Sequence, residues 1–498
     1  MGSRLKSFLP GLLFLATGPL AQQHDLVLQG GRVIDPESGL DAVRDVAVTG
    51  GRIVSVSEGP LDGARVVDVS GLVVAPGFIN LHSHAWTPLG QKFQAQDGVT
   101  TELELESGAY PVAEFGTQGA FAIEGRAVIN YGASLGHAWV RSIMKDGDAA
   151  VSGFDALIGD SAGAAVGMNR PAFREPMRPD ELPALKAHLR AGLDQGGLGI
   201  GMLLDYMSEA VHGAEMLAVF EVAAERGAPV VVHIRRGIAG DPTGLYEVIG
   251  LAEQTGAAVH VCHLQASAMG GVGEFLRAIR AARDRGVAVT TESFPYNAGS
   301  TSNTAAVFNR DWRSIFAIDY ADVEVAATGE RFTEATWREY REKYPGMSVI
   351  HHYNREEWTS IATNAPDVAV ASDGGPIFDL ENKVAPWGIG TSARVLGRYV
   401  REKGSLSLIT ALAKMTSLPA SVLENYSPSF RRKGRIQPGA DADITVFDAG
   451  TVIDNATFQD PYRPSTGIAH VLVNGTFVVK DGEFQEDVHP GQRILRGE

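Results

Sequence analysis

The sequence predicts an α/β protein in which a (β/α)₈ barrel carries a small β-sandwich built from both ends of the chain. Three observations support this fold. Helical and strand patterns alternate through the middle of the chain at about 30 residues per unit. Short strands with glycine turns occupy both ends. No glycine-rich phosphate loop follows a central strand, which disfavours an open nucleotide-binding sheet.

The first residues have the pattern of a secretory signal. Arg4 and Lys6 precede an apolar run over residues 8–20, and the small residue Ala21 follows it. We therefore expect a signal peptide over residues 1–21 and an exported protein, periplasmic or secreted. The single cysteine, Cys262, excludes an intrachain disulfide, and no other stretch is long and apolar enough to span a membrane.

The predicted sandwich comes from two distant segments, residues 22–75 and 434–490. Alternating strands with Gly-Gly turns at 30–31 and 50–51 begin it. Similar short strands are predicted near the other end of the chain, at Asp443–Phe447 and His470–Asn474. We expect the two segments to form one unit.

Residues 76–433 are predicted to form the barrel. Apolar residues at helical spacing indicate helices over 216–225, 246–255 and 274–285. An apolar strand follows each, at 229–233, 257–263 and 287–294. Residues 300–370 are polar with weak periodicity, so we expect long loops over the barrel mouth. With 498 residues and 44% hydrophobic composition, the chain can bury a large core.

Charge excludes one class of partner. The formal net charge is −16 and no basic run interrupts it, so nucleic acid is not expected as a partner. The sequence leaves the oligomeric state open, and a homo-oligomer remains one option.

Two histidines end the first predicted barrel strand, and their spacing suits a metal site. His82 and His84 are two residues apart, so they point to the same face of the strand. Chemistry in this type of barrel lies at the carboxyl ends of the strands. His233 and His263 end two later apolar strands, and Asp373 ends the last one before a glycine turn. These side chains are the predicted metal ligands, with Asp373 also the predicted general base.

A carboxylate joins this set from the strand that begins at Val99. Glu102, Glu104 and Glu106 are spaced two residues apart, so all three point to the same face of the strand. Three carboxylates on one buried face repel one another unless a cation neutralises them. Glu106 lies nearest the mouth and is our candidate bridging ligand, with Glu104 second. An edge strand with a solvated acidic face is the alternative.

These residues together resemble the amidohydrolase superfamily, and more narrowly its N-acyl-D-amino-acid deacylase branch. The matching stretches are Gly98–Thr101, His233–Arg235, Phe294–Thr301, Ala371–Gly374, Gly390–Glu402 and Gly434–Ile444. The resemblance implies one or two zinc ions and a small N-acyl amide as substrate. It implies that zinc lowers the pKa of a water toward ~7 for attack on the amide, that Asp373 moves the proton, and that Tyr296 assists the oxyanion.

Three departures from the branch concern the substrate. Ser107 stands where the branch has a cysteine ligand, Gln265 where it has a lysine, and Trp387 where it has an arginine. In the family, that lysine and arginine hold the substrate carboxylate together with a tyrosine. Of these three residues, only the tyrosine, Tyr296, is present in this chain. The substrate therefore either lacks this carboxylate or is held by Arg235, Arg236 or Arg394. The predicted substrate-binding residues are Arg235, Gln265, Tyr296, Ser300, Trp387 and Arg394, with Trp387 favouring a bulky apolar group.

Other functions stay open at this point. A lactonase or cyclic amidase uses the same attacking water. A deaminase of the superfamily usually carries a glutamate shortly after the first single histidine, whereas Arg235 and Arg236 follow His233 here. A non-catalytic exported binding protein is disfavoured by the complete ligand set.

Overall fold

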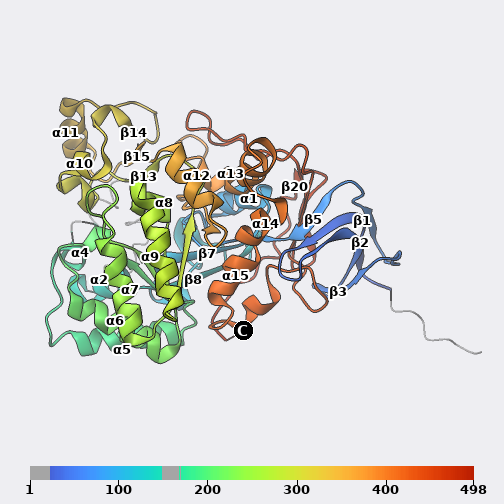
Figure 1. The fold of residues 1–498 in the computed structure, drawn as a ribbon, viewed down its shortest axis with the longest axis horizontal. Helices are drawn as coiled ribbons and strands as arrows, with labels where there is room; N and C mark the ends of the chain where they lie inside the picture. The colour runs from blue at the N-terminus through green and yellow to red at the C-terminus, as the bar shows by residue number, and fades with distance from the viewer. Residues whose placement is uncertain (1–22, 148–167, 169, 498) are drawn as a thin grey trace, which may run out of the picture.

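The computed structural model describes residues 23–147, 168 and 170–497. Its described strands form three sheets of eight, nine and three strands. Figure 1 shows the eight-stranded sheet surrounded by helices in the middle of the molecule, with the blue terminal strands at one end and the olive three-stranded sheet at the other. The predicted signal peptide lies outside the described residues. Within the described part, no helix combines the length and apolarity needed to cross a bilayer.

Eight parallel strands form the barrel, which confirms the predicted fold class. In spatial order they are β16 (Ala369–Val370), β12 (Val289–Ser293), β11 (Val259–Val261), β10 (Val230–His233), β9 (Ile200–Leu203), β8 (Asn130–Gly136), β7 (Val99–Ala109) and β6 (Phe78–Asn80). Val230 and Val232 pack in the cluster under the outer helices, whereas Val231 packs with Leu103 and Cys262. Burial on both faces explains why these strands read as continuous apolar runs.

Helices follow the strands. They include α5 (Leu182–Asp194), α6 (Gly213–Arg226), α7 (Thr243–Thr255) and α9 (Val272–Asp284), with α1 (Pro88–Gln96) and α2 (His137–Asp146) earlier in the chain. Three of them, α6, α7 and α9, lie close to the ranges predicted at 216–225, 246–255 and 274–285. Gly227 and Gly256 end α6 and α7 in the left-handed conformation, with φ of 65° and 78°. Glycine adopts this conformation without steric cost, which explains these two helix ends.

Hydrogen bonds at the mouth join the first and last barrel strands. The Asp373 amide donates to the His82 carbonyl at 2.8 Å, and the His84 amide donates to the Gly374 carbonyl at 2.8 Å. Below them, the Asn80 side-chain amide donates to Ser372 Oγ at 2.7 Å. The barrel therefore closes at the residues that carry three of the predicted ligands.

Both ends of the chain contribute to the nine-stranded sheet, as the sequence predicts. The N-terminal part supplies β1 (Leu26–Asp35), β2 (Leu40–Thr49), β3 (Arg52–Ser57), β4 (Val66–Asp68) and β5 (Val73–Pro76). The C-terminal part supplies β17 (Ile444–Phe447), β18 (Ile468–Val473), β19 (Thr476–Lys480) and β20 (Glu483–Phe484). The two parts meet where β5 pairs antiparallel with β17, with Val74 opposite Val446.

The prediction of long loops over residues 300–370 is wrong. This region contains β13 (Gly299–Ser302), β14 (Val323–Val325) and β15 (Ser348–His351), which form the antiparallel three-stranded sheet. It also contains α10 (Trp312–Phe316), α11 (Glu334–Lys343) and α12 (Glu356–Asn364). Phe308, Trp312 and Trp337 pack together with ring centroids 5.0–5.6 Å apart. A few widely spaced aromatic residues hold these short elements, so the sequence shows little periodicity.

Phe447 couples the terminal sheet to the barrel. It is fully buried, and its ring centroid lies 6.5 Å from that of Phe78 on β6. We expect Phe447→Ala to lower the free energy of unfolding by about 3–5 kcal/mol, because it leaves a cavity between the two sheets. Urea unfolding measures this. Val43→Ala, at a 62% exposed position, is the control and should change little; equal effects would contradict the coupling.

Candidate metal centre and active site

The six predicted ligands converge at the mouth of the barrel. They come from five strand ends: His82 and His84 after β6, Glu106 in β7, His233 at the end of β10, His263 after β11, and Asp373 after β16. Most of these side chains are 5% exposed or less, and the exceptions are His84 at 12% and Asp373 at 23%. The group is therefore buried except on the side where Asp373 opens to solvent.

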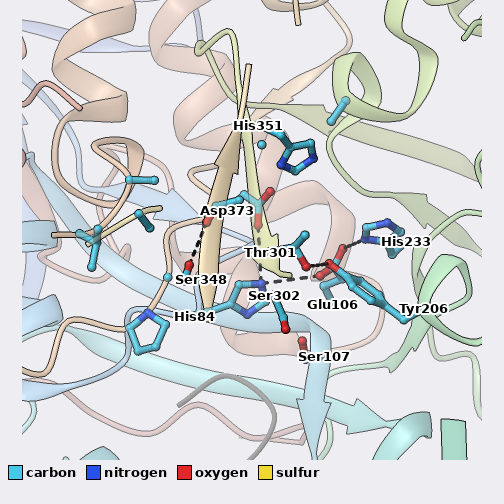
Figure 2. Close-up of a pocket in the computed structure, with 18 of the residues that line it drawn as sticks. His84, Glu106, Ser107, Tyr206, His233, Thr301, Ser302, Ser348, His351 and Asp373 are labelled. Carbon is cyan, nitrogen blue, oxygen red and sulfur yellow. Dashed lines mark hydrogen bonds and ion pairs between the residues drawn. The ribbon is translucent and has the colours of Figure 1, made fainter. Parts of the chain in front are cut away.

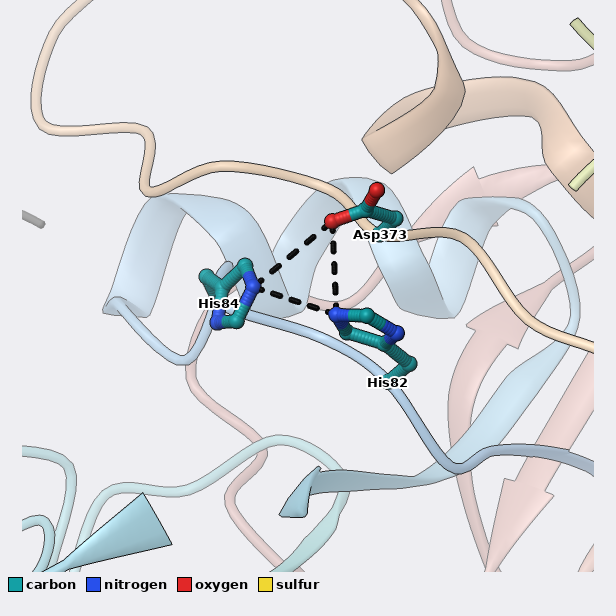
Figure 3. Close-up of side chains that lie close together, drawn as sticks. All are labelled: His82, His84 and Asp373. Carbon is teal, nitrogen blue, oxygen red and sulfur yellow. Dashed lines mark hydrogen bonds and ion pairs between the residues drawn. The ribbon is translucent and has the colours of Figure 1, made fainter. Parts of the chain in front are cut away.

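His82, His84 and Asp373 form the first ligand group, and Figure 3 shows their polar atoms facing one another. His82 Nε2 and His84 Nε2 are 3.2 Å apart, and Asp373 Oδ1 lies 3.3 and 3.6 Å from them. Ligands about 2.0–2.1 Å from a tetrahedral metal are themselves about 3.3 Å apart. The spacing of this group suits a zinc-sized ion.

Glu106, His233 and His263 form the second group, and Glu106 also reaches the first. Glu106 Oε1 lies 2.9 Å from both His233 Nδ1 and His263 Nε2. Its other oxygen, Oε2, lies 3.3 Å from His82 Nε2 and 3.6 Å from His84 Nε2. One carboxylate thus contacts all four imidazoles, an arrangement in which it could bridge two ions.

Glu104 has a different position from Glu106. Its Oε2 lies 2.5 Å from His84 Nδ1, on the side of the ring that faces away from the centre. Glu102 accepts a hydrogen bond from Ser83 at 2.9 Å and contacts none of the ligands directly. Of the three carboxylates, Glu106 is the one in ligand position, and Glu104 orients a histidine.

Outer hydrogen bonds orient the rings of the first two histidines. His82 Nδ1 lies 2.6 Å from Glu292 Oε1, and His84 Nδ1 contacts Glu104, so each Nδ1 donates to a carboxylate. In the metal-binding form each ring is neutral and its Nε2 presents a lone pair, and a cation between the two nitrogens, which are 3.2 Å apart, would accept both lone pairs. Carboxylates behind metal-binding histidines are the usual arrangement in metal sites. The residues present therefore fit a bound metal.

Electrostatics hold the carboxylates ionised. Burial raises the pKa of Glu106, but the electrostatic attraction of His82 and His233 lowers it more. The pKa of Glu106 is therefore well below its usual range. The same balance acts at Glu292, where burial is outweighed mainly by His82 and His260, and the pKa falls to about 2. Both groups are thus available as anions around the centre.

The backbone holds Asp373 in a strained conformation at the edge of the centre. Its φ is 56°, in the left-handed region that residues with side chains rarely adopt. Its amide donates to the His82 carbonyl, and its own carbonyl accepts from Trp387 Nε1 at 2.8 Å. This pair of hydrogen bonds fixes the direction of the Asp373 carboxylate.

The centre opens into a cavity of about 500 Å³. Figure 2 shows part of its wall, with Tyr206 beside Glu106, Thr301 of β13 next to the Tyr206 hydroxyl, and Ser302 and Ser348 nearby. Apolar side chains line much of the rest, among them Trp139, Leu203, Phe294, Val307 and Met347. The cavity has room for a small molecule with an apolar group.

Comparison with known proteins agrees with this geometry. The model of the Amidohydrolase family matches residues 65–479, which is most of the chain. The chain belongs to the amidohydrolase family.

Two kinds of relative stand out for this amidohydrolase. It is 31% identical to an N-acyl-D-glutamate deacylase of Alcaligenes xylosoxydans xylosoxydans, over 96% of this chain and 97% of the relative. It is 28% identical to a dihydroorotase of Pelotomaculum thermopropionicum, over 88% of this chain and 92% of that protein.

A solved structure is similar over nearly the whole amidohydrolase chain. It is an N-acyl-D-glutamate deacylase from Bordetella bronchiseptica in complex with zinc and a phosphonate mimic of the tetrahedral intermediate. The TM-score is 0.77 at 28% identity, and the match covers 95% of this chain and all of that one.

One predicted substrate-binding residue of this amidohydrolase, Ser300, lines the cavity. Arg235 does not, and this prediction is corrected. Its guanidinium donates to Glu247 at 2.9 Å and to the carbonyls of Ser208 and Val211 at 2.8 and 2.5 Å. These bonds turn it away from the cavity.

Four further predictions are corrected because the side chains, three of them buried and Arg394 partly buried, bond or pack outside the cavity. Gln265 donates to the Phe294 carbonyl at 3.0 Å. Tyr296 and Arg394 form a network with Asp454, in which Arg394 lies 4.4 Å from the Tyr296 ring centre. Trp387 is 1% exposed and packs against Phe294, so it supports the wall and holds Asp373. None of the four lines the described cavity.

Several cavity residues were not singled out from the sequence. Asp205 and Tyr206 directly follow β9, and His351 and Tyr353 lie at the end of β15. The positions of Asp205 and Tyr206 at a barrel strand end were a usable signal. His351 and Tyr353 were not predictable, since β15 belongs to the region read as loops.

The two ligand groups predict different effects of removing Glu106 and Glu104. We expect Glu106→Ala to lose bound metal outright, because both groups share this carboxylate. Glu104→Gln should weaken zinc binding by about 10–100-fold, because it removes only the partner of His84. Metal analysis after dialysis against graded zinc buffers measures both. Full zinc content in Glu106→Ala would contradict the bridging position.

The bond from Trp387 to Asp373 predicts a role for the indole N–H. We expect Trp387→Phe to lower kcat for amide hydrolysis by about 5- to 10-fold, because one hydrogen bond of about 1 kcal/mol holds the strained Asp373 backbone. Zinc content should stay unchanged. Trp358→Phe, on α12, is the control and should leave kcat unchanged; an unaltered kcat in Trp387→Phe would contradict the positioning role.

Proposed function

We propose that this protein is a zinc-dependent deacylase that hydrolyses the amide bond of an N-acyl amino acid, with the D series as the first candidate. The observation that carries the proposal is the pair of ligand groups joined by Glu106, with Asp373 lining the adjoining cavity. The deacylase relatives support the reaction class and the D configuration.

The proposed ligands are His82, His84 and Asp373 for one zinc ion and His233, His263 and Glu106 for a second, with Glu106 shared. Zinc would supply a Lewis acid that makes water acidic enough to attack at neutral pH and polarises the amide carbonyl.

The chain itself would move the proton and support the oxyanion. Asp373 would take the proton of the attacking water and deliver it to the leaving nitrogen, which leaves poorly unless protonated. Tyr296 does not line the cavity and its hydroxyl donates to Asp454, which disfavours the oxyanion role that the family resemblance implies. Tyr206 is better placed, since it lines the cavity with its ring 4.9 Å from that of His233. Burial raises its pKa, so it stays a neutral hydrogen-bond donor.

Two parts of the proposal concern the acyl group and the location. The apolar wall formed by Trp139, Leu203 and Met347 suits a hydrocarbon acyl group.

The basic and apolar leader over residues 1–21 supports export, with deacylation outside the cytoplasm.

The test is release of free amine from N-acyl-D- and N-acyl-L-amino acids by the zinc-loaded mature protein. We expect turnover with a preference for the D series. Asp373→Asn should lower kcat by at least 100-fold because it removes the proton acceptor. Hydrolysis of cyclic amides alone would replace the proposal with the activity of the dihydroorotase relatives. Near-normal turnover in Asp373→Asn with full zinc content would contradict the role of Asp373.

A further inference from the structure

Two guanidinium groups share one carboxylate in the wall of the cavity. Asp205 Oδ1 accepts hydrogen bonds from Arg310 Nη2 at 2.7 Å and from the Arg236 backbone amide at 3.0 Å. The Arg236 side chain approaches less closely, with Nη1 3.7 Å from Asp205 Oδ2. Arg310 thus makes the closer contact with the carboxylate, and the two guanidinium groups carry one positive charge more than Asp205 neutralises.

The Arg236 side chain is buried without a full set of partners. It is 9% exposed, and its Nε has no hydrogen-bond acceptor among the described residues. Arginine stays charged at any physiological pH and offers five N–H donors in a planar fork. A buried charge of this kind is costly unless another group pairs with it.

The neighbouring cavity residues do not supply that pair. Burial and Arg236 lower the pKa of His351 to about 3, so this imidazole is neutral. Burial raises the pKa of Tyr353 to about 12, and its hydroxyl donates to the Ala266 carbonyl at 3.2 Å. The Tyr206 hydroxyl is engaged with Thr301 at 3.1 Å. The wall therefore presents a cation whose ion pair, with Asp205 at 3.7 Å, is long and shared with Arg310.

Arg236 lies close to the reacting centre. It follows His233 by three residues, so their Cα atoms are at most about 10 Å apart, and both side chains line the same cavity. Arg235, its neighbour, has all its bonds outside the cavity. An anion that enters the cavity meets Arg236 and not Arg235.

We propose that Arg236 binds a carboxylate of the substrate. It would replace, from the end of another strand, the anion site for which the family uses a lysine and an arginine and this chain has Gln265 and Trp387. This inference rests on the proposed deacylase function and assigns the residue that recognises a carboxylate of its substrate. The planar fork of arginine matches a carboxylate in bidentate geometry. The carboxylate is either the α-carboxylate of the amino acid or an acidic side chain.

The experiment uses matched substrate pairs that differ in one carboxylate. N-acetyl-D-leucine and its C-terminal amide test the α-carboxylate, and N-acetyl-D-glutamate and N-acetyl-D-glutamine test the side-chain carboxylate. We expect the zinc-loaded wild-type protein to prefer the acid in at least one pair. Arg236→Met should lower that preference in kcat/KM by about 10- to 100-fold, and Arg236→Lys should lower it less.

Arg235→Met is the matched control, because it removes the same charge one residue earlier. The acid-to-amide preference should be unchanged in it, whatever its stability. Turnover with no acid preference in the wild type, or an unchanged preference in Arg236→Met, would overturn the role of Arg236 and leave the deacylase function standing.

A binding measurement separates failure of the two proposals. Calorimetry compares N-acetyl-D-leucine and N-acetyl-D-glutamate with their amides on zinc-loaded Asp373→Asn and on Asp373→Asn/Arg236→Met. Tighter binding of an acid that is lost with Arg236 supports the carboxylate site even if no substrate of the panel is hydrolysed. Equal binding to the two proteins overturns it. Thermal melting and zinc content confirm that the variants are folded.

Discussion

The closure of the barrel between its first and last strands is the constraint on which the centre depends. The hydrogen bonds from Asp373 to His82 and from His84 to Gly374 join two segments that are about 290 residues apart in the sequence. The same residues supply three of the six converging side chains. The geometry of the ligands thus depends on the closure of the barrel, so a distortion of either one alters the other.

The surroundings of the centre divide into layers with different tasks. Glu106 contacts all four histidines, while Glu104 and Glu292 fix the rings of His84 and His82 from behind. Trp387 holds the strained backbone of Asp373 from outside the cavity. Few of these groups are exposed, which keeps the electrostatic interactions strong in a region of low dielectric constant.

The sequence predicts the direction of a side chain best where one strand sets it. His82, His84, His233, His263 and Asp373 end strands, and the structure brings all five together with Glu106. Prediction failed for Arg235, Gln265, Tyr296, Trp387 and Arg394, where loop and helix residues choose between the cavity and buried partners. It also failed for residues 300–370, whose sparse aromatic core leaves little periodicity.

The sequence by itself determined the barrel, the union of the two chain ends and the strand ends that carry the centre, because alternation and helical periodicity are local properties. Tertiary structure alone decided which carboxylate joins the histidines and which arginine faces the cavity. Neighbouring residues such as Arg235 and Arg236 have the same chemistry. Their roles differ because Glu247 and two carbonyls satisfy the first, and Arg310 takes the carboxylate that would otherwise satisfy the second.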